Sequence, residues 1–232
     1  MRYFIKSIIP LWLLFWIGCD DNNSLHQQYL DRGETIYIGA VDSIVASPGY
    51  KRVKFDWRTS TDPRIEKTVF HWSQNNESFT FEIPVGKAEI GREKSYIHDF
   101  DEGVYSFEVV NEDNREGNRS LSKEITVEVY GDSYIESLRN INILSMTVSD
   151  DNTELTVNWA GIESALTQYT TVSYLSRTGS NPDPQRVENT DTKTVIVVGQ
   201  ILPGDSLSVV TSYLPEDGID IVDAIPKKYA VK

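Results

Sequence analysis

Cysteine is almost absent from this chain of 232 residues. The whole sequence contains a single cysteine, Cys19, so no intramolecular disulfide can form. The stability of the folded part must therefore come from burying apolar side chains. Hydrophobic residues make up 39% of the sequence, which is enough for one large domain or two small ones with ordinary cores.

Histidine is also scarce, and this bears on metal binding. The three histidines, His26, His71 and His98, form no pair four residues apart and no HExxH motif. We therefore expect no zinc site, no cofactor and no catalysis by a Cys/His pair.

Basic residues are outnumbered by acidic ones. There are 22 Lys and Arg against 35 Asp and Glu, which gives a formal net charge of −13. Removal of an N-terminal leader that carries Arg2 and Lys6 takes this to −15. Such a charge argues against nucleic acid and anionic lipid head groups as partners, and it favours solubility of an exported domain.

The N-terminus has the features of a bacterial lipoprotein signal. Arg2 and Lys6 are followed by an apolar segment, Ile8 to Ile17, that is too short to span a bilayer. Trp16-Ile17-Gly18 before Cys19 resembles the lipobox, which implies cleavage before Cys19 and acylation of its thiol. Residues 1–18 are then a leader, and residues 19–37 are the lipidated cysteine and a tether. The alternatives are an uncleaved anchor or a simple secretory signal, with Cys19 incidental.

After residue 40 the hydrophobic pattern predicts an all-β protein. Val53, Phe55 and Trp57 alternate with charged residues, and Tyr105, Phe107 and Val109 alternate with polar ones. The pattern then repeats, as is typical of two homologous units. Segments 53–57, 70–72 and 103–107 have counterparts at 155–159, 172–174 and 204–209. We predict two tandem β-sandwiches, at 38–130 and 131–232, with the junction at residues 130–134.

These units resemble immunoglobulin-like modules of the fibronectin type III kind. The resemblance implies seven short strands in two antiparallel sheets per unit. Trp57, Trp72 and Trp159 fall at inward-facing positions and are expected in the cores. Tyr105 occupies the position of the tyrosine corner, whereas the second unit has Ser206 or Leu207 there and is expected to lack one.

A closer resemblance rests on segments 29–39, 102–108, 116–120 and 130–134. They look like a domain-of-unknown-function family of Bacteroidota lipoproteins. The resemblance implies an outer-membrane lipoprotein at the cell surface that is encoded near SusC/SusD-type glycan-uptake systems and has no assigned catalysis. The implied partners are the membrane through the lipid anchor, and a polysaccharide or SusC/SusD-type outer-membrane proteins.

Exposed aromatic rings are the residues to examine for a sugar ligand, because sugars stack on ring faces. With the tryptophans assigned to the leader or the cores, the candidate ligand contacts are Tyr50, Tyr96 and Tyr134. The leading hypothesis is a non-enzymatic binding or spacer module that is accessory to glycan capture.

Two other functions stay open. One is a structural adhesin or assembly protein that binds a protein partner through a sheet edge or an end loop. The remote one is a glycoside hydrolase, which needs two carboxylates across a cleft. Acidic residues gather at 102–116, but turn chemistry explains most of them. The segment 111–118 does not fit the EF-hand spacing for calcium.

Overall fold

The computed structural model confirms an all-β chain. It describes residues 37–113, 117–161, 164–179, 181–189, 191–197 and 201–232. The predicted leader, the tether except Tyr37, and Cys19 lie outside the described residues. Apart from the strands, the described elements are a short 3-10 helix, η2 (Lys87–Glu89), and one turn and a half of α-helix, α3 (Asp132–Ser137).

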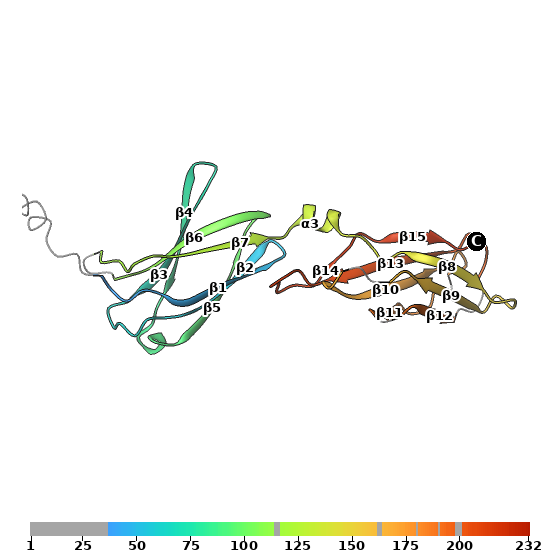
Figure 1. Cartoon of the computed structure of the whole chain (residues 1–232), viewed down its shortest axis with the longest axis horizontal. Helices are drawn as coiled ribbons and strands as arrows, with labels where there is room; N and C mark the ends of the chain where they lie inside the picture. The colour runs from blue at the N-terminus through green and yellow to red at the C-terminus, as the bar shows by residue number, and fades with distance from the viewer. Residues whose placement is uncertain (1–36, 114–116, 162–163, 180, 190, 198–200) are drawn as a thin grey trace, which may run out of the picture. The chain divides into compact units, whose positions relative to one another are not determined.

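The first half of the chain forms two antiparallel sheets (Figure 1). The three-stranded sheet has the order β1 (Asp42–Gly49), β2 (Arg52–Arg58), β5 (Glu93–Asp99). The four-stranded sheet has the order β4 (Glu77–Pro84), β3 (Lys67–Gln74), β6 (Gly103–Glu112), β7 (Lys123–Val129). These seven strands are the number predicted for an immunoglobulin-like module.

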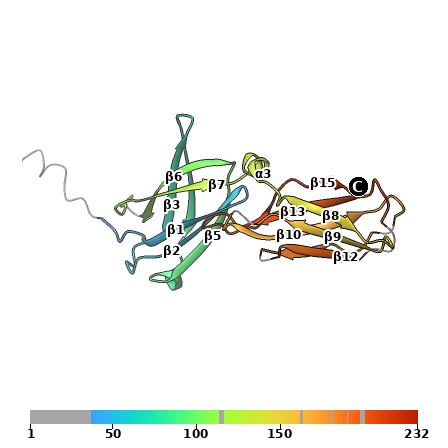
Figure 2. The same ribbon diagram turned by 45° about the vertical axis from the view of Figure 1, so that its right-hand side comes forward.

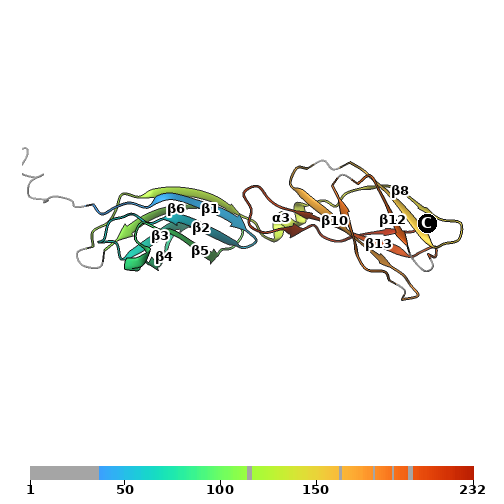
Figure 3. The same ribbon diagram turned by 90° about the horizontal axis from the view of Figure 1, so that it is seen from below.

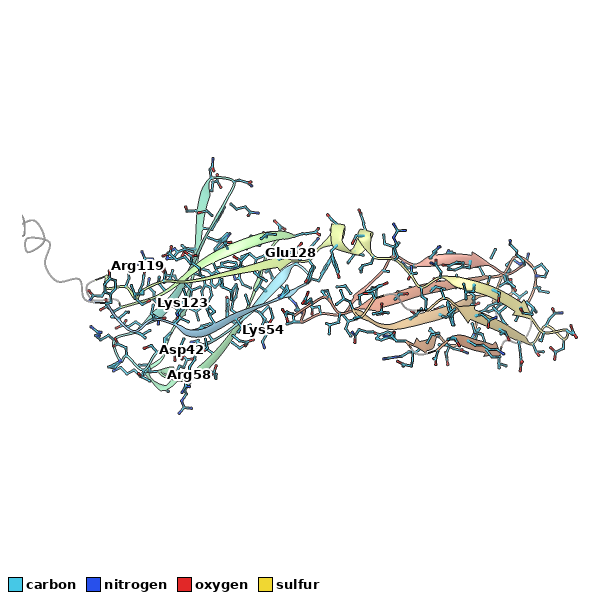
Figure 4. The ribbon with its side chains drawn as sticks, in the orientation of Figure 1. Asp42, Lys54, Arg58, Arg119, Lys123 and Glu128 are labelled. Carbon is cyan, nitrogen blue, oxygen red and sulfur yellow. The ribbon has the colours of Figure 1, made fainter. Side chains whose placement is uncertain are left out.

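Alternation in β2 places the core of this first unit. Val53, Phe55 and Trp57 are fully buried, as predicted. Lys54 and Arg58 lie on the other face of the same strand, which borders solvent (Figure 4). β2 lies between β1 and β5, and it pairs with both (Figure 3). Its inward side chains therefore lie at the centre of the sheet. Burial of one face of this sheet is therefore the main stabilising feature of the unit.

The predicted tyrosine corner is present in the first unit. The hydroxyl of Tyr105 donates a hydrogen bond to the carbonyl oxygen of Asp101 at 3.0 Å, and the ring is buried. This bond ties the start of β6 to the turn that precedes it.

Tyr105→Phe should therefore lower the free energy of unfolding of the first unit by about 1 kcal/mol, because a buried hydrogen bond is lost while the ring stays. Urea unfolding measures this. Tyr96→Phe is the matched control, since its ring is 38% exposed and a change there should be within about 0.5 kcal/mol. Equal effects of the two changes would contradict a stabilising corner.

The second half of the chain repeats this arrangement (Figure 2). Its three-stranded sheet has the order β8 (Ile143–Val148), β9 (Glu154–Trp159), β12 (Lys193–Val197). The other sheet contains β11 (Gln185–Glu188), β10 (Thr167–Leu175), β13 (Ser206–Tyr213), β14 (Val222–Asp223) and β15 (Lys227–Ala230).

The two halves correspond strand by strand. β8, β9 and β12 follow the order of β1, β2 and β5, and both β14 and β15 pair with β13 as β7 pairs with β6. Pro226 lies between β14 and β15, and its lack of an N–H breaks the last strand in two. Each half has its own buried cluster, around Phe55 in the first and Trp159 in the second. The repeat seen in the sequence is thus a repeat of topology, while the limits of the two domains stay a prediction.

A buried carboxylate stands where the second unit lacks a tyrosine corner. Leu207 is fully buried, and the preceding Asp205 is also buried. The carboxylate of Asp205 accepts hydrogen bonds from the Tyr174 hydroxyl at 2.5 Å and from the amide of Leu202 at 2.8 Å. The amide and Nε of Arg177 donate to it at 3.0 and 3.1 Å. Asp205 thus ties the start of β13 to β10 through its side chain.

The phenol of Tyr174 should make the second unit sensitive to alkali. Burial and its hydrogen bond to Asp205 raise the pKa of Tyr174 from 10.0 to about 12. A raised pKa in the folded state means that the contribution to stability is complete below pH 10 and is lost as the pH rises from 10 to about 12. Denaturation at a series of alkaline pH values should show this loss, and Tyr174→Phe should remove that part of the pH dependence. An unchanged alkaline profile in the variant would contradict the assignment.

Candidate binding surface

The outer strands β4 and β5 meet along one open side of the first unit. β4 pairs only with β3, and β5 pairs only with β2, so each ends its sheet. The ring of Phe81 on β4 stacks on the imidazole of His98 on β5, with centroids 4.4 Å apart. The Phe81 ring also lies 5.9 Å from the ring of Tyr96. These contacts close the side of the sandwich with aromatic side chains.

All of these rings come from inward-facing positions. Tyr96 and His98 pair across the sheet with Phe55 and Val53, which are buried. On the other sheet, Phe79 and Phe81 pair with Trp72 and Phe70. We name the resulting group the aromatic edge: Trp72, Phe79, Phe81, Tyr96 and His98.

The aromatic edge runs from the core to solvent. Trp72, Phe81 and His98 are half-buried, whereas Phe79 is 39% exposed and Tyr96 is 38% exposed. Phe79 stacks on Trp72 with centroids 5.4 Å apart, and Trp72 in turn contacts Phe107 of the core. The two exposed rings are therefore held in place by half-buried ones. Rigid, partly exposed rings of this kind are suited to binding by stacking.

The charges beside the aromatic edge are mostly negative. Lys67 pairs with Glu82 and Lys94 pairs with Glu89, each at 2.7 Å. Glu77, which lies on the same face of β4 as Phe79 and Phe81, has no ion pair among the described residues. Uncompensated carboxylates would repel an acidic ligand, so the surface favours a neutral or cationic one.

His98 behaves as a neutral ring in this setting. Burial lowers its pKa below the ordinary value for histidine, and the nearby carboxylate of Asp99 opposes this only in part. The stacking contact with Phe81 is therefore one between two uncharged rings near neutral pH.

Two of the three tyrosines chosen from the sequence, Tyr50 and Tyr134, contact the segment 130–132, and the third lies elsewhere. Tyr96 belongs to the aromatic edge. Tyr50 lies beyond β1, and its hydroxyl donates to the carboxylate of Asp132 at 2.5 Å, which raises its pKa. Tyr134 lies in α3 and is half-buried, with its ring 4.6 Å from that of Tyr130.

Only Tyr96 of the aromatic edge is among the ligand contacts predicted from the sequence. Phe79 and Phe81 are not among them, and Trp72, which is expected in a core, packs half-buried against it. The signal was available, since Phe79, Phe81 and Ile83 alternate with polar residues. Alternation shows which face a residue occupies, but it does not show that the strand ends its sheet.

Other chemistry finds little support in the described ranges. They hold no group of three or more His, Cys, Asp or Glu side chains arranged to bind a metal ion. The carboxylate of Glu102 accepts from the amides of Ser133 and Tyr134, and that of Asp113 accepts from Asn118. Over the same part of the chain, no helix is long and apolar enough to cross a membrane.

Comparison with known proteins places the chain in context. Residues 19–221 match a family model described as a domain of unknown function. Comparison with curated proteins gave no significant match.

Among solved structures, a two-domain fibronectin type III segment of chicken tenascin is similar, at 19% identity and a TM-score of 0.36. The match covers 84% of this chain and 99% of the tenascin segment. The FN1–FN3 domains of chicken CNTN1 match at 14% identity and a TM-score of 0.38. This match covers 85% of this chain and 68% of the CNTN1 chain.

Proposed function

The chain belongs to the DUF4998 family, a domain of unknown function, and from this premise we propose a role that its own residues support. The protein is a non-enzymatic binding module, held to a membrane by lipid on Cys19, that captures a neutral polysaccharide through the aromatic edge. The observation that carries this proposal is the exposure of Phe79 and Tyr96 at inward-facing positions of the two outer strands.

The choice of ligand follows from the shape and charge of the surface. Sugar rings present apolar C–H faces that stack on aromatic rings, and the half-buried Trp72 and Phe81 hold the exposed rings at fixed positions. The unpaired carboxylate of Glu77 disfavours polysaccharides rich in carboxylates. A neutral glycan is therefore the ligand class that this surface fits best.

The proposed location is the outer membrane, with the module displayed at the cell surface. Arg2, Lys6, the apolar segment and Cys19 support export and acylation. Metabolic labelling with radioactive palmitate should label the wild-type chain, and Cys19→Ser should abolish the label and release the protein from the membrane fraction. A labelled Cys19→Ser chain would contradict attachment at this residue.

Affinity electrophoresis tests the binding function. We would run the lipid-free Cys19→Ser chain through gels that contain xyloglucan, galactomannan or polygalacturonate. Retardation is expected on a neutral polysaccharide and not on polygalacturonate. Phe79→Ala and Tyr96→Ala should each weaken binding roughly tenfold, as expected for the loss of one stacking ring.

Tyr50→Ala is the matched control for this experiment, because Tyr50 is 37% exposed, close to the value for Tyr96, but lies outside the aromatic edge. It should leave retardation unchanged. Migration unaffected by either neutral polysaccharide, or an equal loss with Tyr50→Ala, would overturn the proposal.

A protein partner is the second candidate function. The observation that favours it is an unpaired length of strand backbone in the four-stranded sheet of the first unit. This unpaired backbone lies on β6, away from Tyr96 of the aromatic edge, and would bind a partner at a different site.

A further inference from the structure

The hairpin of β3 and β4 leaves its sheet before it ends. β3 pairs with β6 only from Lys67↔Glu112 to Trp72↔Phe107. The pairing of β3 with β4 goes on to Gln74↔Glu77. Figures 1 and 2 both show the end of this hairpin standing away from β6. We name the projecting segment, Ser73–Ser78, the arm.

The arm has a defined conformation of its own. Asn75 and Asn76 have φ values of +52° and +66°, as a two-residue type I′ turn requires. The hydroxyls of Ser73 and Ser78 lie 3.5 Å apart across the two strands. The base of the arm is fixed by the stack of Phe79 on Trp72. The departure from β6 is therefore a built feature of the hairpin.

The departure of the arm leaves one edge of β6 bare. From Gly103 to Ser106, β6 continues to pair with β7 on its other side. On the side toward β3, the backbone of this segment has no hydrogen-bonding partner within the described ranges. Val104 is 68% exposed and Ser106 is also exposed, so the bare edge is open to solvent.

The residues that directly line this edge are polar or apolar, while the arm also carries Glu77 on its β4 strand. Ser73 lies on the arm and Val104 and Ser106 lie on β6, while Trp72 closes the inner end with its ring 5.5 Å from that of Phe100. We name the space between the arm and Gly103–Ser106 the β6 slot.

We propose that the β6 slot accepts an extended, uncharged segment of a partner protein, which adds as a strand to β6. Unpaired N–H and C=O groups of a strand repeat along the chain with the spacing of another strand. Only a polypeptide backbone matches that spacing, and strand addition of this kind is an established mode of peptide recognition. Glu77 on the arm would repel an acidic segment, and a charged side chain placed beside the half-buried Trp72 would lose hydration, so an uncharged segment is favoured.

This site goes beyond the proposed glycan function and is tested separately from it, although Trp72 belongs to both surfaces. Its contacts are backbone groups of β6, whereas the glycan surface depends on the ring of Tyr96 on β5. A second copy of the chain is a poorer occupant, because two chains that each carry a formal charge of −13 repel one another.

Peptide titration followed by NMR of the backbone amides tests the proposal. The probe is a capped heptapeptide of alternating Ser and Val, added to the lipid-free Cys19→Ser chain. The amide signals of Gly103–Ser106 and of Ser73 and Gln74 should shift, with half-saturation below about 1 mM. Amide exchange in Gly103–Ser106 should slow roughly tenfold or more, since new hydrogen bonds protect the exchanging groups.

Two controls separate strand addition from other binding. The same peptide with N-methyl groups on alternate amides should cause no shift, because it cannot complete the ladder. Tyr96→Ala should weaken retention by neutral polysaccharide roughly tenfold and leave the peptide shifts intact, so the two proposals can fail separately.

Four results would overturn the proposal. They are equal shifts with the N-methylated peptide, the same amide shifts on adding xyloglucan, the same shifts on raising the protein concentration alone, and no shift at millimolar peptide. The first indicates binding without a ladder, the second a glycan in the slot, and the third a second copy of this chain.

Discussion

Phe55→Ala should destabilise the first unit by about 4 kcal/mol, the largest loss we expect from a single core substitution. Phe55 is fully buried at the centre of the cluster of rings. Its ring lies 4.8 Å from that of Phe70 and 5.1 Å from that of Phe107. Removal of the ring leaves a cavity that neighbours on both sheets cannot fill without moving.

Urea unfolding followed by tryptophan fluorescence measures this effect. Phe55→Leu should cost less than half as much, because most of the volume is kept. Leu121→Ala is the control at an exposed apolar position and should change stability by less than about 0.5 kcal/mol. A loss below 1 kcal/mol for Phe55→Ala would show that the rings do not hold the two sheets together.

Asp205→Ala should have the corresponding effect on the second unit. The substitution leaves the Tyr174 hydroxyl and the amide of Leu202 without the acceptor to which they donate. Loss of a buried, fully bonded carboxylate is among the more damaging single changes, so we expect the melting temperature to fall by roughly 10 °C. Thermal unfolding followed by circular dichroism measures the change.

The same carboxylate sets the sensitivity of this unit to acid. Hydrogen bonds from Tyr174, Arg177 and Leu202 hold the pKa of Asp205 well below its ordinary value. A lowered pKa in the folded state means that its contribution is complete above the unfolded pKa, near 3.8, and is lost as the pH falls below that value. Asp205→Asn should flatten this part of the acid profile. An Asp205→Ala chain that is as stable as wild type at neutral pH would contradict the role given to Asp205.

Alternation in the sequence was enough to predict the central strands. Val53, Phe55 and Trp57 on β2 and Leu155 and Trp159 on β9 are buried as expected, because each strand lies between two others and has one covered face. The repeated hydrophobic segments likewise predicted that the two halves share a topology, because those segments include the central strands of each half. Local pattern and sheet position agree wherever a strand is central.

The Asp205–Tyr174 contact, which takes the place of a tyrosine corner in the second unit, shows the limit of residue matching. The sequence has Ser206 and Leu207 at the position of the corner tyrosine and therefore predicts that the corner is missing. A side-chain hydrogen bond nevertheless holds the start of β13, because the Tyr174 hydroxyl on β10 donates to the carboxylate of Asp205. Its partners, Tyr174 and Asp205, are far apart in the sequence, so only the fold could reveal the contact.

The aromatic edge and the β6 slot could not be predicted for a related reason. Phe79 and Phe81 have the alternation of core residues, and they face inward as core residues do. Their exposure results from the place of β4 at the end of its sheet and from the departure of the arm after Trp72. The Asn75-Asn76 turn signal was visible in the sequence, but where the hairpin leaves β6 depends on the pairing of the whole sheet.

The central claim is that the outer rings of the first unit form a binding surface while the inner rings hold its sheets together. NMR of the aromatic side chains during titration with xyloglucan oligosaccharides tests this most directly. The ring signals of Phe79 and Tyr96 should shift in proportion to each other, and those of Tyr50 and Tyr134 should stay in place. Shifts confined to Tyr50, Tyr134 or the second unit would contradict the account, and so would ring signals of Phe79 and Tyr96 that do not change on adding the oligosaccharides.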